Sequence, residues 1–201
     1  MTVPSVEAAA LAGPPTPART ADEASRRERL RGLFAAIAAG EPDAVESLYE
    51  AVSDRLYGLA LWRTGSREDA GDVVQEVFLR VVASRGRLGA VSEPFPWLLG
   101  LAHHVAVDVA RRTRQRPTVP LEEAPALVEA GPDAGRPVDA ARASRLLARL
   151  PAAQRDAVYL RHFADCTFAA IGRITGVPVF TAASRYRLGL GKLRRLMEGA
   201  P

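Results

Sequence analysis

Apolar residues recur at every third or fourth position through most of the first half of the chain, which is the spacing of one face of an α-helix. The pattern predicts four helices, over residues 25–39, 41–64, 66–82 and 97–112. Ser66, followed three residues later by Asp69, has the spacing of a capping box and favours a helix start there. A segment rich in glycine and proline, 86–96, predicts a loop before the fourth helix. We expect these elements to form a first helical domain over residues 25–116.

The segment before this domain, residues 1–24, contains a short alanine-rich run that prolines soon interrupt. It lacks the basic residues that precede the apolar run of a secretory leader. We therefore predict that residues 1–24 form a disordered tail.

The helical period fails between residues 117 and 139, where prolines and glycines are frequent. The acids of this segment face only Arg136, and they are Glu122, Glu123, Glu129, Asp133 and Asp139. This composition predicts a flexible acidic linker. Helical spacing returns from Ala140, and Pro151 is well placed for the first turn of a further helix.

The last part of the chain, residues 140–201, ends in the pattern of a helix-turn-helix. Residues 167–175 predict a short helix, Gly176 and Val177 a tight turn, and Pro178 the start of a helix that runs to about Met197. No segment shows the alternation of a β-strand. The predicted fold class is therefore all-α, with two small helical domains joined by a flexible acidic linker.

Composition narrows the range of functions. The chain has 201 residues, a formal net charge of +4 and 48% hydrophobic residues, which is enough to exclude disorder of the whole chain. Its single cysteine, Cys166, excludes an internal disulfide framework and a multi-cysteine zinc site, and it fits a reducing compartment such as the cytoplasm. Polar residues interrupt every apolar stretch before the length of a membrane span, so we expect none.

The helix-turn-helix carries positive charge without compensating acids. From Cys166 to Met197 the sequence contains no aspartate or glutamate. A solvated basic face would explain a lone run of cations, but here the run lies on the second helix of a helix-turn-helix, which favours binding to duplex DNA. By position, the candidates for base edges are Thr181, Ser184 and Arg185. The candidates for phosphates are Arg187, Lys192, Arg194 and Arg195.

The first domain offers two further candidate surfaces. Polar residues cluster along the start of the third helix, namely Glu68, Asp69, Asp72, Gln75 and Glu76. Of these, Asp72, Gln75 and Glu76 form a polar ridge suited to a protein partner with a basic surface. Acids in the first turn of a helix also stabilise the helix by interacting with its dipole. This effect alone explains why Glu68 and Asp69 occur there. The second surface combines cations with aromatic residues, as single-stranded nucleic acid requires, although Trp97 alone would more often pack in a core. Its members are Arg85, Arg87, Phe95, Trp97, Arg111, Arg112 and Arg114.

Signs of catalysis are absent from the sequence. His103 and His104 are adjacent, so on a helix they point about 100° apart and cannot chelate one metal as an i, i+4 pair does. Cys166 has no evident histidine partner, and the chain contains neither a phosphate-binding glycine loop nor a nucleophile elbow. We therefore expect a protein that is not an enzyme and has no cofactor and no metal.

Two pairs of segments resemble a known family. SREDAGDVVQEVFLRVV with PFPWLLGLAHHVAVDVARR is similar to the second conserved region of bacterial RNA polymerase sigma factors of the extracytoplasmic-function (ECF) type, in the sigma-70 family. LARLPAAQRDAVYLRHF with TFAAIGRITGVPVFTAASRYRLGLGKLRRL is similar to their fourth conserved region. Because both motifs occur in the family's order, the resemblance is more specific than a helix-turn-helix alone.

This resemblance implies a transcription initiation factor that binds core RNA polymerase, directs it to promoter DNA and assists melting. It implies that Asp69, Asp72, Gln75 and Glu76 dock on the polymerase clamp. The loop 85–94 and the helix 97–112 would hold the minus-ten strand, residues 181–195 would read the minus-35 element, and the linker would pass along the RNA channel. An anti-sigma protein is the expected regulatory partner.

The chain also departs from the family's usual pattern. Gly71 and His104 stand where the family usually has Glu and Asn, and the usual Gly-Thr-Val-Lys-Ser-Arg reads Phe-Thr-Ala-Ala-Ser-Arg over residues 180–185. Leu188 replaces a usual Arg. Gly189 and Gly191 each cost about 1 kcal/mol relative to Ala inside a helix, which predicts a frayed end of the last helix in the absence of DNA. Two alternatives therefore stay open: a helix-turn-helix regulator that does not engage polymerase, and a degenerate sigma relative.

Overall fold

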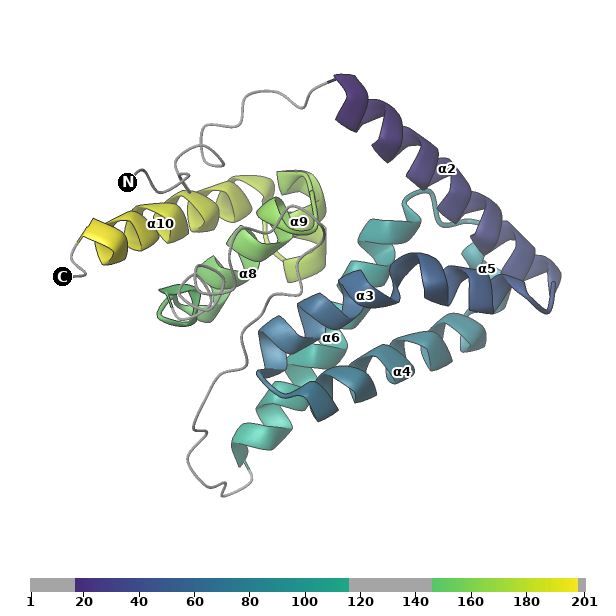
Figure 1. Ribbon diagram of the computed structural model, residues 1–201, viewed down its shortest axis with the longest axis horizontal. Coiled ribbons are helices and arrows are strands. Elements are labelled where there is room, and N and C mark those ends of the chain that lie inside the picture. The colour runs from purple at the N-terminus through teal and green to yellow at the C-terminus, as the bar shows by residue number, and fades with distance from the viewer. Residues whose placement is uncertain (1–16, 116–145, 199–201) are drawn as a thin grey trace, which may run out of the picture.

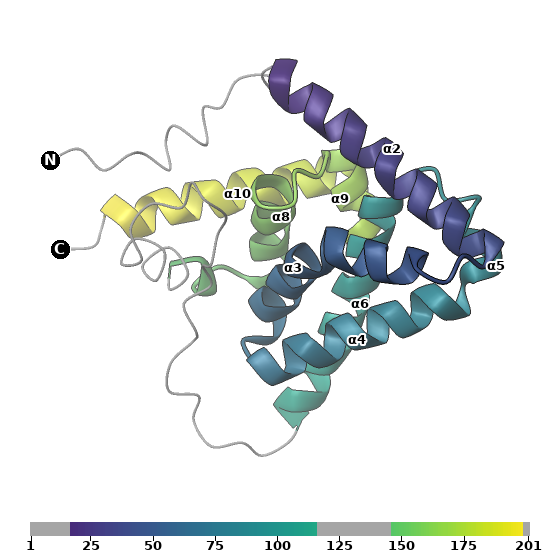
Figure 2. The same ribbon diagram turned by 45° about the vertical axis from the view of Figure 1, so that its right-hand side comes forward.

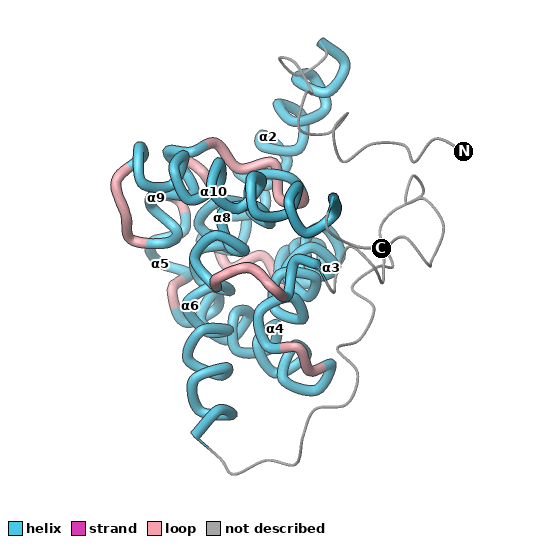
Figure 3. The backbone as a smooth tube through the Cα atoms, turned by 90° about the vertical axis from the view of Figure 1, so that its left-hand side faces the viewer, coloured by secondary structure: helices cyan, strands magenta, loops and turns pink. Residues whose placement is uncertain are grey.

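A computed structural model of the chain describes residues 17–115 and 146–198, and every element assigned there is a helix (Figure 1; Figure 3). The first range contains α2 (Pro17–Ala39), α3 (Ala44–Thr64), α4 (Arg67–Ala83), α5 (Arg85–Leu88) and α6 (Pro94–Gln115). The second contains α8 (Ala152–His162), α9 (Phe168–Thr175) and α10 (Val179–Glu198). The all-α prediction with two helical domains is confirmed. The predicted linker, residues 117–139, lies outside the described residues.

Two predicted boundaries differ from the structure. Helix α2 begins at Pro17, inside the segment 1–24 that was predicted to be a disordered tail, so the helix starts earlier than expected. Proline suits the first turn of a helix because it has no N–H to leave unpaired there. The predicted loop 86–96 contains most of α5, and α6 begins at Pro94 rather than at Trp97. None of the described helices combines the length and hydropathy needed to cross a bilayer.

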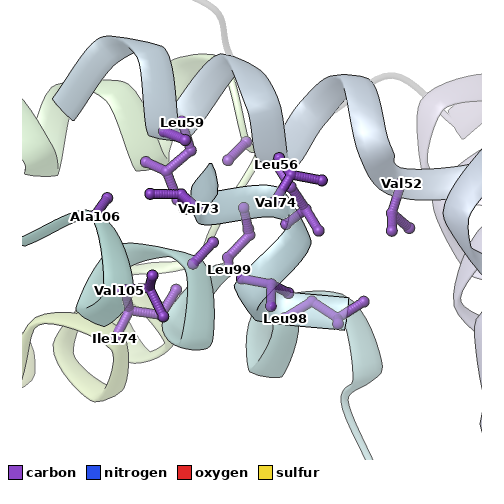
Figure 4. Close-up of a cluster of buried hydrophobic side chains, with 14 of the residues drawn as sticks. Val52, Leu56, Leu59, Val73, Val74, Leu98, Leu99, Val105, Ala106 and Ile174 are labelled. Carbon is purple, nitrogen blue, oxygen red and sulfur yellow. The ribbon is translucent and has the colours of Figure 1, made fainter. Parts of the chain in front are cut away.

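The core of the first domain follows the predicted apolar stripes. Leu30 and Phe34 of α2 are almost completely buried, as are the inward residues of the next helices. Those inward residues are Leu48, Leu56, Leu59, Val73, Val77, Leu98 and Leu99. Figure 4 shows Ile174 of α9 beside Val105 of α6 in the same cluster as Leu56 and Val74. The core therefore continues from the first domain into the second.

The two domains approach closely where α3 meets α8. A Cβ atom added to Gly58 would lie 2.9 Å from the hydroxyl oxygen of Tyr159, so glycine allows this approach. The rings of Trp62 and Tyr159 pack with centroids 5.2 Å apart. Trp62 also joins a second apolar cluster with Leu150 and Leu193. Helices α3 and α6 therefore provide the surface on which the second domain packs.

A buried carboxylate lies at the centre of this interface. Nη1 of Arg63 donates hydrogen bonds to both carboxylate oxygens of Asp156, each at 3.1 Å. Nε2 of His103 lies 3.2 Å from Oδ2 of the same residue, and Asp156 is 5% exposed. The cluster joins α3 and α6 of the first domain to α8 of the second. Its three members lie far apart in the sequence, so the fold alone brings them together.

Candidate functional site

The start of α4 is fixed by its cap. The side chain of Ser66 accepts a hydrogen bond from the backbone N–H of Asp69 at 3.2 Å, so the predicted N-terminal cap is present. From there, Asp69, Asp72 and Glu76 follow along one flank of the helix and line a cleft of about 480 Å³ between α4 and α6. Asp108 and Arg112 of α6 also line this cleft. The structure thus brings together three of the four residues predicted for protein docking.

Neighbouring groups modify the charges of this acidic flank. The carboxylate of Asp69 accepts a hydrogen bond from the hydroxyl of Thr113 at 3.4 Å. The carboxylate of Glu76 pairs with Nε of Arg80 at 2.7 Å, and both side chains are more than 40% exposed. An exposed pair of this kind contributes little to stability. The flank therefore presents a mixture of charges dominated by carboxylates.

The fourth predicted docking residue, Gln75, is exposed beside apolar side chains. Leu79 is 66% exposed, Val82 46% and Tyr49 49%, and the rings of Tyr49 and Phe78 pack with centroids 5.0 Å apart. Val82 and Tyr49 continue the helical spacing of apolar residues in their helices, which predicts burial, but both are exposed, so this prediction is wrong. The core takes up Val73, Val77 and Val81, and Val82, about 100° further round the helix than Val81, points to solvent. Leu79 was not singled out from the sequence, although its spacing of i+4 from Gln75 and i+3 from Glu76 places it on their polar face.

The cations predicted for single-stranded nucleic acid fall into two separate groups. Arg85 and Arg87 are exposed on α5, which precedes the N-terminus of α6. Arg111 and Arg112 are exposed in the last turns of α6, where Nη2 of Arg111 lies 3.9 Å from the carboxylate of Asp108. Arg114 also lies in α6, but its side chain is outside the described part of the chain. Since α6 has 22 residues, its two ends are about 33 Å apart.

Trp97 has two roles in the structure. Its ring packs edge-on against Phe34 of the core, with centroids 5.7 Å apart and an interplanar angle of 89°. It also lines a cleft of about 930 Å³ between α6 and α9, together with His104 and Arg173. Core packing, the commoner role expected for a single tryptophan, is therefore present. The other wall of the cleft belongs to the second domain.

The helix-turn-helix is held by local contacts of α9. The side chain of Thr167 caps α9 by accepting a hydrogen bond from the N–H of Ala170 at 3.2 Å. Gly176 ends the helix in the left-handed region, at φ 68°. A Cβ atom on Gly172 would lie 2.7 Å from the carbonyl oxygen of Val177, so any larger residue would push the turn away from α9. These local contacts therefore determine the direction of α10 relative to α9.

Helix α10 packs on α8 through its apolar side. Ala182, Gly189 and Leu193 are buried, and a Cβ atom on Gly189 would lie 2.9 Å from Cγ2 of Val158. Gly189 is thus a packing glycine, and the helix is continuous to Glu198. The predicted fraying of its C-terminal half is not seen. The tertiary contact with α8 outweighs the low helix propensity of glycine.

The outward side of α10 differs from the sequence prediction. Arg187 and Arg194 are exposed as expected for phosphate ligands, but Thr181, Ser184, Arg185 and Lys192 are each partly covered. The residues that project furthest include two that were not among the candidates: Phe180 is 75% exposed and Leu188 58%. Both were visible in the sequence as departures from the usual family pattern.

Two titratable groups of the second domain, His162 and Cys166, serve packing. Nε2 of His162 lies 2.9 Å from the hydroxyl of Tyr186, which ties α8 to α10. Burial, with a smaller effect from Arg161, lowers the pKa of His162, so the ring is neutral near pH 7. Burial raises the pKa of the Cys166 thiol to about 12, as expected for a small buried hydrophobic residue.

The adjacent histidines have separate environments. His103 is buried against Asp156, whereas His104 is exposed at the cleft between α6 and α9. Within the described ranges, no group of three or more His, Cys, Asp or Glu residues could hold a metal ion.

Comparison with known proteins identifies both halves of the chain. Residues 48–116 match the family model described as Sigma-70 region 2, and residues 140–193 match the one described as Sigma-70, region 4. The chain is 31% identical over 174 residues to the ECF RNA polymerase sigma factor SigM of Mycobacterium tuberculosis (strain ATCC 35801), covering 86% of this chain and 87% of the relative. It is 30% identical over 159 residues to the RNA polymerase sigma factor CarQ of Myxococcus xanthus, covering 79% and 91%.

Solved structures share the fold. One is CnrH in complex with the cytosolic domain of CnrY, with a TM-score of 0.63, 20% identity, and 86% of this chain and 99% of that chain covered. Another is the sigma factor RpoE in complex with the anti-sigma factor NepR from Bartonella quintana, with a TM-score of 0.66, 18% identity, and 79% and 99% covered.

Proposed function

The chain belongs to the ECF group of the sigma-70 family of RNA polymerase sigma factors, and on that premise we propose how its surfaces divide the work of initiation. As a sigma factor, it binds core RNA polymerase and directs the enzyme to promoter DNA. The observation that carries this conclusion is the presence of both sigma regions, in order, in one chain. A helix-turn-helix regulator that does not engage polymerase would have no use for the first region.

The domain boundaries form the first part of the proposal. Residues 25–116 act as the region 2 domain, which docks on polymerase and handles the minus-ten element. Residues 140–201 act as the region 4 domain, which binds the minus-35 element. Residues 117–139 connect the two. The contacts among α3, α4 and α6 in the first domain, and those of α10 with α8 and α9 in the second, support this division.

Polymerase docking is assigned to α4. Asp69, Asp72 and Glu76 supply a negative flank, and Gln75 lies beside the exposed side chains of Leu79 and Val82. An apolar strip bordered by carboxylates suits a partner whose surface combines apolar side chains with Lys or Arg. The charges steer the encounter and the apolar strip supplies the contact area.

Promoter opening is assigned to α5 and α6. Arg85 and Arg87 are exposed on α5, which precedes α6 in the chain, and Trp97 of α6 lines the cleft. Unstacked bases pack on aromatic rings while cations hold the backbone. Arg111, Arg112 and Arg114 lie about 21–26 Å beyond Trp97 along the helix axis and bind phosphates further along the DNA.

Duplex reading is assigned to α10. Thr181, Ser184 and Arg185 lie near its N-terminus, where a recognition helix meets base edges. Arg187, Lys192 and Arg194 lie further along the same helix and bind phosphates. In α9 and α10 only Glu198 is acidic, so the potential is positive along the whole contact.

The remaining parts of the proposal concern context. The protein acts by binding, without catalysing a reaction, and it works in the cytoplasm, where RNA polymerase transcribes the chromosome. Two proteins of the same fold were solved with a protein partner, and one of those partners, NepR, is named an anti-sigma factor. We propose that an anti-sigma protein also restrains this chain, by covering the apolar strip of Leu79 and Val82 and so excluding polymerase.

A transcription assay tests the function. The purified full chain is mixed with bacterial core RNA polymerase and a library of promoter fragments, and the run-off transcripts are sequenced. Core binding is measured by pull-down from the same mixture. We expect core binding and a set of transcripts that share upstream elements. Binding without transcripts would indicate a degenerate sigma relative, and absence of both would favour the polymerase-independent regulator.

A further inference from the structure

The N-terminus of α10 exposes apolar side chains that no described part of the chain covers. Phe180 is 75% exposed, and the neighbouring Val179 is 52% exposed. The contacts between α10 and the rest of the domain are made by other residues: Ala182, Gly189 and Leu193 are buried, and the ring of Tyr186 packs against Phe168 at 5.4 Å. Within the described residues, folding of this domain therefore leaves most of the Phe180 side chain exposed.

The surroundings of Phe180 indicate which kind of ligand suits it. Residues 180, 184 and 187 follow at i, i+4 and i+7, so Phe180, Ser184 and Arg187 share one face of α10. A hydroxyl and a cation thus accompany the ring, and no acid lies between Phe168 and Met197. This mixture matches polyanionic duplex DNA. Figure 1 and Figure 2 show α10 well apart from α4, the helix assigned to polymerase docking.

The position of Phe180 in the helix-turn-helix indicates which part of the DNA it contacts. The second helix of this motif enters the major groove with its N-terminal residues against base edges. The groove offers one apolar group among the four base pairs, the C5-methyl of thymine, and phenylalanine is among the side chains that contact it. Phe180 is the second residue of α10, so it lies where those edges are read.

We propose that Phe180 is a specificity-determining residue that reads the C5-methyl group of one thymine in the minus-35 element. This inference rests on the proposed role of α10 in duplex reading and deepens it. The usual family sequence has glycine at this position, so the contact belongs to this chain rather than to the family. The promoters of this protein therefore have a thymine upstream that a glycine-bearing relative does not require.

Replacing thymine by deoxyuridine tests the contact directly, because only the methyl group is removed. The full chain is assembled with core RNA polymerase, and a minus-35 duplex is selected from a random library. Each thymine of the selected duplex is then replaced singly. At one thymine we expect the affinity of the wild-type holoenzyme to fall roughly fourfold, as burial of one methyl group predicts. With Phe180→Ala, thymine and deoxyuridine duplexes should bind equally at that position.

A matched control uses another exposed phenylalanine of the same domain. Phe163, at the end of α8, is 51% exposed and stacks on Tyr159, so Phe163→Ala removes a similar side chain away from α10. This variant should keep the wild-type preference for thymine. Circular dichroism melting of both variants checks that the domain remains folded.

The outcomes separate this inference from the proposed function. A sequence-specific holoenzyme with no methyl-dependent thymine, or a Phe180→Ala variant with an unchanged thymine preference, overturns the role of Phe180 alone. If Phe180→Ala leaves DNA reading intact but abolishes binding of a regulatory protein, the ring is a protein contact and the inference is wrong. A holoenzyme that selects no upstream sequence overturns both the inference and the assignment of α10.

Discussion

The two surfaces proposed to hold DNA differ in what lies in front of them. The outward face of α10 borders solvent, with Phe180, Arg187 and Arg194 all exposed. The N-terminal half of α6, which carries Trp97, instead faces α9 of the second domain across a cleft. In this packed arrangement α10 is open to duplex DNA. The surface proposed for the melted strand instead lies in a cleft whose other wall is formed by the second domain. Promoter recognition and promoter opening therefore depend differently on how the domains pack.

The contact that places α9 and α8 over the first domain depends on few charged groups. Asp156 bonds to Arg63 and lies against His103, and at the edge Glu93 pairs with Arg173 at 3.2 Å and with Arg27 at 3.7 Å. Within the described residues, three buried nitrogen atoms around the centre lack a hydrogen-bond partner, namely Nε1 of Trp62, Nε of Arg63 and Nδ1 of His103. Buried polar groups without partners reduce the net stability of a contact. The packing of the domains is therefore sensitive to the loss of Asp156.

The largest effect is expected from Asp156→Ala. Removal of the carboxylate leaves the Arg63 cation and the His103 ring buried without their partner. Loss of one member of a buried ion pair lowers the free energy of unfolding by about 3–5 kcal/mol. The free energy of unfolding, measured with urea, should fall by this amount. Amide hydrogen exchange in α6 and α9 should accelerate as the domains separate, so that the Trp97 side of α6 becomes as accessible as α10.

Asp165→Asn is the matched control for this substitution, because Asp165 has a positive φ of 52°, a backbone conformation that asparagine adopts more readily than alanine. Asp165 pairs with Arg55 at 3.5 Å between the same two domains, but its side chain is 44% exposed. Loss of its charge should cost under about 1 kcal/mol. Equal and small effects of the two substitutions would show that the charge cluster does not hold the domains together.

The next effect concerns polymerase docking. Charge reversal of the acidic flank, Asp72→Lys with Glu76→Lys, should abolish binding to core RNA polymerase while the DNA contacts of the second domain remain. The new lysines repel a basic partner surface, and Lys at position 76 also meets Arg80 on the same helix. Pull-down with core enzyme measures the first effect, and binding of a minus-35 duplex measures the second.

A control for this variant needs the same change of charge elsewhere. Glu28 of α2 and Asp54 of α3 are both exposed and lie outside the acidic flank. The variant Glu28→Lys with Asp54→Lys should bind the core enzyme as the wild type does. If both double variants bind equally well, the docking surface has been assigned to the wrong helix.

A smaller effect distinguishes two arginines of α10. Arg185→Ala should relax sequence preference at one base pair, with a loss of about 1–3 kcal/mol for the preferred base. Arg194→Ala should weaken binding about uniformly across sequences and reduce the salt slope by about one unit. Titration of duplex variants at several salt concentrations separates the two. Uniform losses from both substitutions would refute the division between base and phosphate contacts.

The same comparison shows which features the sequence could predict. Helix α4 follows from local signals, because Ser66 and Asp69 mark its start and Val73, Val77 and Val81 mark its buried face. The helix-turn-helix is likewise local, since Thr167, Gly176 and Pro178 act within a few residues. Such features depend on backbone geometry over one or two turns.

Contacts between segments far apart in the sequence could not be predicted from the sequence patterns. Asp156 meets Arg63 across 93 positions and His103 across 53, and no spacing rule links such residues. Helical periodicity also misplaced Val82 and Tyr49, since a stripe indicates one side of a helix but not how far a neighbour covers it. Leu79 and Phe180 could have been noticed, because each is a large apolar residue outside a buried stripe.

The smallest effect concerns pH and the position of α10. The half-buried ring of His162 bonds to Tyr186, and partial burial lowers its pKa below the ordinary value of 6.5. Because the unfolded chain then binds a proton more readily than the native one, this group's contribution to stability is present above about pH 6.5 and is lost as the pH falls below it. The free energy of unfolding should decline from pH 7 to pH 5, and His162→Gln, which retains a hydrogen-bonding side chain, should show a shallower decline. Chemical denaturation at a series of pH values measures both slopes, and identical slopes would show that His162 does not couple proton binding to the packing of α10 on α8.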